Sequence, residues 1–107
     1  MTSTADRIRE CEERAEKALW SLEVAGRSAE ALAIYEQASA DLEQVLAHCD
    51  SATAQDAQRA LAYCLMRQGN MLRVLGRAEE AARASEREIA AARASGNPLT
   101  LARSLLS

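Results

Sequence analysis

Large aromatic side chains are almost missing from this chain of 107 residues, which has no phenylalanine and only Trp20, Tyr35 and Tyr63. Glycine and proline are also scarce, with four copies and one copy, whereas alanine accounts for 24 residues. Alanine has the highest helix propensity, and glycine and proline have the lowest. The composition therefore excludes a bulky aromatic core and predicts an all-α protein whose helices approach one another closely.

Residues that carry catalysis or bind metals are equally scarce. The single histidine lies in the run His48-Cys49-Asp50, and the chain offers no further ligands at the spacing that a zinc site needs. It also lacks a Glu-x-x-His pair, a glycine-rich phosphate loop and a serine–histidine arrangement. We interpret His48 as a residue near a helix C-terminus, where its charge is favoured. We therefore expect no enzyme activity, no catalytic residues, no metal and no cofactor.

Cysteines and apolar runs point to a cytoplasmic protein. Cys11, Cys49 and Cys64 are scattered and follow no secretory signal, which favours free thiols in a reducing compartment over a disulfide framework. No apolar run approaches the roughly 20 residues that are needed to cross a bilayer. We expect the protein to be cytoplasmic and to make no contact with a membrane.

Charge is distributed unevenly along the chain. Residues 1–50 contain 5 basic and 11 acidic side chains, and residues 51–107 contain 8 basic and 5 acidic ones, so the halves carry −6 and +3. This difference suits head-to-tail association, an anionic partner for the second half, or two solvent faces. Charges of both signs alternate along the expected helices, which favours the solvent faces. Without a basic cluster or stacking aromatics, nucleic acid is not an expected partner.

Apolar residues at spacings of three and four predict five helices. They cover residues 5–25, about 28–48, about 54–75, 78–94, and a short segment from Pro98. Ser3 or Thr4 is expected to cap the first helix, Ser51 or Thr53 the third, and Asn97 the fifth.

The chain repeats itself at an interval of fifty residues. The phrase Gly26-Arg27-Ser28-Ala29-Glu30-Ala31 recurs as Gly76-Arg77-Ala78-Glu79-Glu80-Ala81, with each glycine expected to end a helix in the left-handed conformation. The third helix also repeats the apolar stripe of the first, with Leu61, Leu65, Gln68, Leu72 and Leu75 matching Cys11, Ala15, Ala18, Leu22 and Ala25. The apolar side expected for the fourth helix is Ala78, Ala81, Ala82, Ser85, Ile89 and Ala92. Gly69 interrupts the third helix, which predicts that another backbone approaches closely there.

These features resemble the tetratricopeptide repeats. The first repeat supplies Gly26, Ala31, Tyr35 and Ala38 of that pattern, and the second supplies Gly69, Gly76, Ala81 and Pro98. The chain departs from the pattern at Leu19, Ser85 and Glu88, and its repeats are longer than the usual 34 residues. The resemblance implies one domain over 1–107: two antiparallel hairpins (5–49 and 54–95) stacked as a short right-handed solenoid, and a terminal helix at 98–107.

In such a solenoid, the first and third helices would line a concave groove that takes a protein or peptide partner. Asn70 lies beside Gly69, where similar repeats hold a peptide backbone or carboxylate, and Arg67 and Arg73 would suit an acidic ligand. Trp20 is either a groove anchor or a residue that seals the hairpin interface, and we favour sealing. The candidate partner-binding residues are Trp20, Tyr63, Met66, Arg67, Asn70 and Arg73, with an ordinary solvated face as the alternative interpretation.

The last helix is strongly apolar for the end of a repeat array, where a polar face is needed. Its only charged side chain is Arg103. It could cover the end of the groove, begin a third repeat, or pair with a second chain through Leu101, Leu105 and Leu106. The main functional hypothesis is thus a non-catalytic interaction module, or scaffold, and the alternative is a self-assembling helical domain that forms a homodimer or larger oligomer without a foreign ligand.

Overall fold

All regular structure in the described part of the chain is helical. The computed structural model describes residues 3–106 and has no strand among them, which confirms the expected all-α class. The elements are α1 (Thr4–Ala18), η1 (Leu19–Glu23), α2 (Ser28–Leu46), α3 (Ser51–Val74), α4 (Ala78–Ala94) and α5 (Pro98–Leu106). The segment η1 is a π-helical turn that continues α1 directly. Ser107, the last residue of the terminal helix expected at 98–107, lies outside the described residues.

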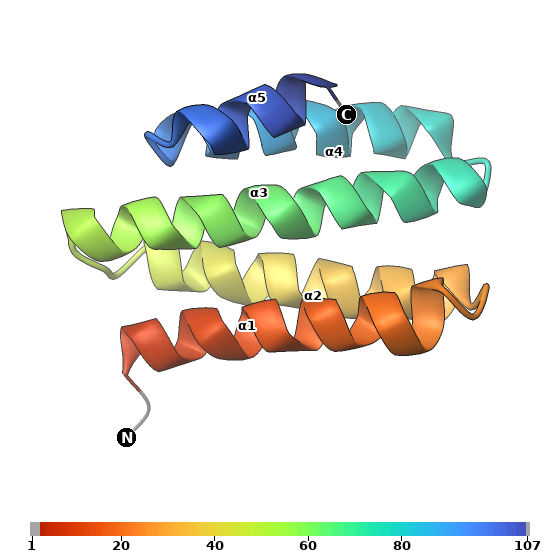
Figure 1. The fold of residues 1–107 in the computed structure, drawn as a ribbon, viewed down its shortest axis with the longest axis horizontal. Coiled ribbons are helices and arrows are strands. Elements are labelled where there is room, and N and C mark those ends of the chain that lie inside the picture. Colours follow the sequence, from red (N-terminus) through yellow and green to blue (C-terminus); the bar gives the residue numbers. More distant parts are fainter. Residues whose placement is uncertain (1–2, 107) are drawn as a thin grey trace.

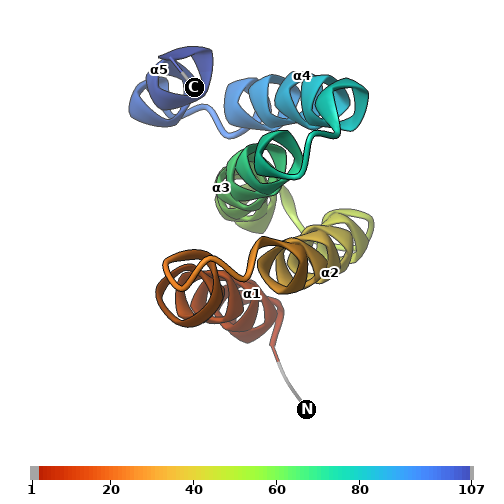
Figure 2. The same cartoon turned by 90° about the vertical axis from the view of Figure 1, so that its right-hand side faces the viewer.

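The helices form two layers. Consecutive helices run in opposite directions (Figure 1), and a view along their axes places α1, α3 and α5 on one side and α2 and α4 on the other (Figure 2). The central helix is α3, which contacts α1, α2, α4 and α5. Among residues 3–106, no helix is both long and apolar enough to span a membrane.

Local hydrogen bonds set where three of the helices begin. The Ser3 hydroxyl accepts from the amide of Asp6 at 3.1 Å, and the Asn97 side-chain oxygen accepts from the amides of Leu99 and Thr100 at 3.0 and 3.2 Å, as expected for caps. The third helix begins earlier than expected, because Asp50 is its cap rather than Ser51 or Thr53. The Asp50 carboxylate accepts from the amide of Thr53 at 2.8 Å, and this hydrogen bond lowers the pKa of Asp50.

The duplicated phrase forms two nearly identical turns. Gly26 and Gly76 have φ values of 79° and 76°, in the left-handed region that was expected for them. In each turn, the amide of the following arginine donates to the carbonyl oxygen of the leucine five residues earlier, at 2.8 Å. Each arginine also donates twice to a glutamate three residues later, in the pairs Arg27–Glu30 and Arg77–Glu80.

The core is formed by α1, α2, α3 and α4, and it includes most of the stripes predicted for the first and third helices. The largest side chains that are almost completely buried include Tyr35, Leu42, Leu65 and Leu72. The predicted stripes become less buried near the glycine turns. Leu22 is half-buried, Ala25 is exposed and Leu75 is 39% exposed. An ion pair between Arg14 and Asp41, at 2.6 Å, joins α1 to α2 and holds the pKa of Asp41 below its ordinary value.

The predicted apolar side of α4 is partly wrong. Ala81 and Ala92 are buried as expected, but Ala78 and Ala82 are exposed, and Ser85 and Ile89 are half-buried. The buried face instead consists of Ala81, Ala84, Glu88, Ala91 and Ala92. Helix α4 therefore buries Ala84 and Ala91 more completely than Ile89, and these small side chains permit close packing on α3.

Another helix does pack against Gly69, as expected; this helix is α4, and it lies at ordinary contact distances. A Cβ atom at this position would lie 3.8 Å from the Cβ atom of Ala84 and 3.9 Å from the carbonyl oxygen of Ala81. The approach of the α4 backbone therefore leaves room for a methyl group, and the packing does not require glycine.

Candidate partner-binding surface

The candidate residues lie on one layer of the fold. Trp20 belongs to η1, and Tyr63, Met66, Arg67, Asn70 and Arg73 belong to α3. Because α1 contacts α3 directly and runs in the same direction, the two helices present one continuous face (Figures 1 and 2). The structure thus brings the predicted residues onto one surface, the α1/η1/α3 face.

The π-helical turn distinguishes the end of α1 from the corresponding part of α3. The amide of Val24 donates to the carbonyl oxygen of Leu19 at 3.0 Å, five residues earlier, whereas α3 continues as a regular α-helix through Gly69. Gly69 is the position fifty residues after Leu19. Single π-helical turns inside α-helices are frequent at functional sites.

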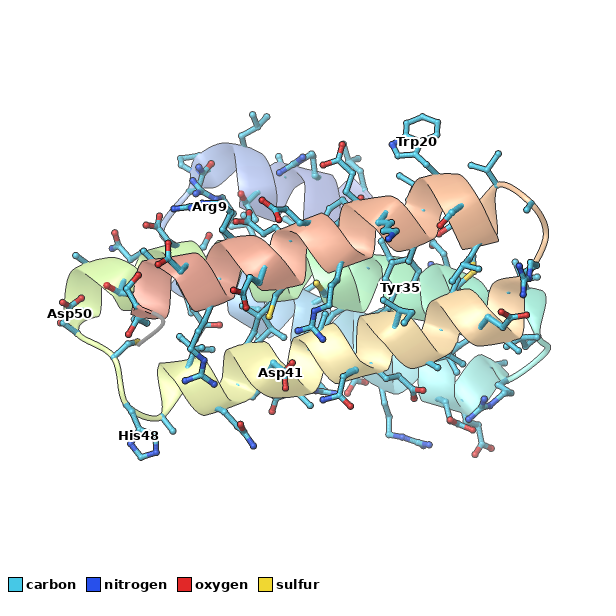
Figure 3. The ribbon with its side chains drawn as sticks, turned by 90° about the horizontal axis from the view of Figure 1, so that it is seen from below. Arg9, Trp20, Tyr35, Asp41, His48 and Asp50 are labelled. Carbon is cyan, nitrogen blue, oxygen red and sulfur yellow. The ribbon has the colours of Figure 1, made fainter. Side chains whose placement is uncertain are left out.

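Trp20 is directed away from the body of the molecule. Its residue surface is 67% exposed, and Figure 3 shows the indole projecting from the edge of the ribbon. The interpretation that Trp20 seals the hairpin interface is therefore wrong. Tyr35 instead fills the space between the first two helices, where it is completely buried.

A largely covered polar network joins η1 to α2 and α3. The Tyr35 hydroxyl donates to one oxygen of Glu23 at 2.9 Å, and the Arg67 guanidinium lies 3.5 Å from the other oxygen. The side chains of Arg67 and Glu23 are only 19% and 17% exposed. Burial, together with the bond to Glu23, raises the pKa of the Tyr35 hydroxyl. Arg67 is therefore engaged inside the protein and is a poor candidate for an acidic ligand.

The remaining candidates on α3 differ in how accessible they are. Tyr63 is half-buried against the core, which raises the pKa of its hydroxyl, and Met66 is half-buried as well. The side-chain oxygen of Asn70 accepts from the guanidinium of Arg73 at 2.6 Å, and Arg73 also donates to the hydroxyl of Ser85 at 3.4 Å. Asn70 therefore uses its acceptor internally, and Arg73 is the exposed cation on the α3 side.

Acidic side chains on α1 complete this face, and sequence reasoning assigned them no role. Glu13 and Glu16 are exposed and form no ion pair with any residue in 3–106. Glu12 lies near Arg59 of α3, and partial burial nevertheless raises the pKa of Glu12. The spacing of Glu13, Glu16 and Trp20, at i, i+3 and i+7, would have indicated a shared helix face.

The leucines proposed for self-association are mostly on the outside of α5. Thr100 and Ser104 form its buried side, whereas Leu105 and Leu106 are 56% and 88% exposed. Leu101 is half-buried and packs against the core, and Leu99 is also exposed. Helix α5 thus packs through Thr100, Ser104 and Leu101 and leaves three leucines accessible.

Metal ligands do not gather in the described part of the chain. Within residues 3–106, no group of three or more histidine, cysteine, aspartate or glutamate side chains is arranged to hold an ion. His48 is exposed beside the connection between α2 and α3 (Figure 3). Comparisons of the chain with models of known families, with curated proteins and with solved structures found no match.

Proposed function

We propose that this protein is a non-catalytic interaction module that binds a peptide or helix of a partner protein on its α1/η1/α3 face. The observation that carries this proposal is the exposure of Trp20, the sole tryptophan, on a π-helical turn. Covering an exposed tryptophan is worth roughly 2–3 kcal/mol, and tryptophan is enriched among the residues that dominate binding energy. The half-buried Tyr63 and Met66 on the neighbouring helix would extend the contact.

The arrangement of the helices supports a scaffold similar to tetratricopeptide repeats. We propose that α1–α2 and α3–α4 are two stacked hairpins of a short right-handed solenoid, and that α5 follows them. In such a stack, α1 and α3 supply the face that receives a ligand. The duplicated glycine turns are consistent with this reading. Three free cysteines suit a cytoplasmic location.

Selection from a display library of random 12-residue peptides tests the proposal. Peptides recovered on the wild-type protein should bind at least tenfold more weakly to Trp20→Ala, because the variant loses the apolar anchor. Asn70→Ala should weaken binding by a smaller factor. Circular dichroism should show unchanged helicity for both variants. If the peptides bind Trp20→Ala as tightly as wild type, the α1/η1/α3 face is not the binding site.

A second candidate function is self-assembly through α5. The exposed Leu99, Leu105 and Leu106 support it, because contiguous apolar patches of this kind often mark interfaces. Light scattering at increasing protein concentration decides between a monomer and an oligomer. An oligomer that Leu105→Glu dissociates would favour self-assembly, whereas a monomer at high concentration would leave it without support.

A further inference from the structure

We infer that the segment bound on the α1/η1/α3 face is basic, with lysine or arginine side chains opposite Glu13 and Glu16 and an apolar or guanidinium group over Trp20. This inference rests on the proposed function and adds the chemistry of the partner. It reverses the sequence-based expectation of an acidic ligand, which depended on Arg67 and Arg73.

Two carboxylates and the exposed indole lie on the same side of α1. Glu13, Glu16 and Trp20 are separated by three and four residues, so they follow one side of the helix into η1. Trp20 projects outward in Figure 3, and both glutamates are exposed. A ligand that covers the indole would therefore pass close to two carboxylates.

Most cations near this face are paired with carboxylates, whereas Glu13 and Glu16 are not paired in the described part of the chain. Arg9 lies 3.3 Å from Asp6, Arg59 lies 3.4 Å from Asp56, and Arg67 is paired with the partly buried Glu23. Glu13 and Glu16 have no such partner within residues 3–106. The cations are thus largely neutralised, whereas these two carboxylates are not. Two cations are exceptions. Arg73 is held by Asn70 and Ser85 and not by a carboxylate. Lys17 of α1 is exposed and forms no ion pair within residues 3–106, but it borders a hollow that Ile34 of α2 also lines, on the α2 side of α1.

Charge complementarity then favours a basic ligand. A lysine or arginine within reach of Trp20 gains a cation–π interaction as well as attraction to the carboxylates. An acidic segment would meet like charge at Glu13 and Glu16, which disfavours the wrong partner and slows its association. Removing two exposed carboxylates should weaken such a complex by roughly three- to tenfold, given the modest strength of single surface pairs.

A second copy of the chain is the main competing source of basic side chains. Arg83 and Arg93 on α4 are exposed and form no ion pair with other residues in 3–106. If these arginines covered Trp20 of a neighbouring molecule, tryptophan emission would shift with protein concentration in the absence of any peptide. That result would identify a second copy as the occupant and overturn the inference of a foreign basic segment.

The composition of the selected peptides is the first test. Peptides recovered from the random 12-residue library that require Trp20 should be enriched in lysine and arginine relative to the unselected library. Enrichment in aspartate and glutamate, or no charge preference, would overturn the inference and leave the proposed function standing. If no recovered peptide requires Trp20, both the proposed function and the inference of a basic ligand are contradicted.

Charge-matched variants provide the second test, with the fluorescence of Trp20 as the readout. The most enriched basic peptide is titrated into wild type, into Glu13→Gln/Glu16→Gln, and into the control Glu79→Gln/Glu86→Gln, which removes two exposed charges from α4. The first double variant should bind roughly three- to tenfold more weakly and the control within about twofold of wild type. If both double variants bind the peptide equally weakly, the effect comes from net charge in general. The inference that Glu13 and Glu16 contact the basic segment would then be overturned.

Arg73→Glu gives a test of sign. If the ligand is basic, this variant should bind the selected peptide as tightly as wild type or more tightly, because it adds a carboxylate to the same face. Weaker binding of the peptide by Arg73→Glu would indicate an acidic contact and contradict the inference.

Discussion

The two hairpins share their turns but differ at the position where the first helix of each meets the second. In the α1–α2 hairpin, the Tyr35 hydroxyl donates to the carboxylate of Glu23, and in the α3–α4 hairpin the Arg73 guanidinium donates to the hydroxyl of Ser85. These residues occupy equivalent places, fifty positions apart. In both hairpins a charged residue of the first helix bonds a hydroxyl of the second. The charged residue is an anion that accepts in the first hairpin and a cation that donates in the second.

The exchange determines which charges reach the surface. Glu23 is largely covered beside Tyr35 and pairs with Arg67, whereas Arg73 is exposed. On the outer side, Trp20 of the first hairpin corresponds to Asn70 of the second. A duplicated scaffold can thus keep its turns and core while the face that meets a ligand changes.

The largest expected effect is a difference in stability loss between two equivalent leucines. Leu22 and Leu72 are equivalent positions, but Leu72 is buried and Leu22 is half-exposed. We expect Leu72→Ala to lower the free energy of unfolding by about 3 kcal/mol and Leu22→Ala by about 1 kcal/mol, since a buried cavity adds to the lost transfer energy. Urea denaturation measures both. Equal losses would mean that the two hairpins are packed alike.

The cross-helix contacts should also differ in strength. Tyr35→Phe leaves the partly buried Glu23 without its hydroxyl donor, which should cost about 1–2 kcal/mol of stability. Ser85→Ala removes a longer contact from the exposed Arg73 and should cost less than about 0.5 kcal/mol. Thermal unfolding of the two variants checks the order. A larger loss for Ser85→Ala would reverse the comparison.

The turns should behave alike, in contrast to the helices. Gly26→Ala and Gly76→Ala each place a Cβ atom on a residue with positive φ and should each destabilise the protein by about 1 kcal/mol. Neither position has a neighbour within 4 Å of the added carbon, so no steric clash adds to the backbone strain. Losses that differ by more than about 0.5 kcal/mol would show that the turns are not equivalent.

The smallest effect concerns Gly69, the counterpart of Leu19. A methyl group at this position meets α4 at ordinary contact distances, and alanine is the better helix former. We therefore expect Gly69→Ala to raise the free energy of unfolding by up to about 1 kcal/mol. Urea denaturation again measures the change. A clear loss of stability would restore the expectation that α4 approaches α3 too closely for a side chain.

The features that were predicted correctly from the sequence are those that depend on neighbouring residues. Gly26 and Gly76 end helices because few other residues adopt positive φ cheaply, and Asn97 caps α5 through its own side chain. The outward position of Trp20 and the pairing of Glu23 with Arg67 were not predicted. Both depend on how α1, η1 and α3 pack, and the π-helical turn at Leu19 has no reliable local signal.

The face of α4 was missed for a related reason. Periodicity placed Ile89 among the buried residues, but close packing on α3 favours alanines, and Ala84 and Ala91 are buried instead. The preference for small residues is a property of the contact between two helices. It cannot be read from α4 alone.

The emission spectrum of Trp20 measures whether the indole is exposed on the free protein, since no other tryptophan contributes to it. If the indole is displayed on the free protein, its emission in dilute solution should match that of a hydrated tryptophan derivative, and acrylamide should quench it efficiently. Emission at clearly shorter wavelength, with protection from acrylamide, would contradict the account, because it would place the indole inside the hairpin interface.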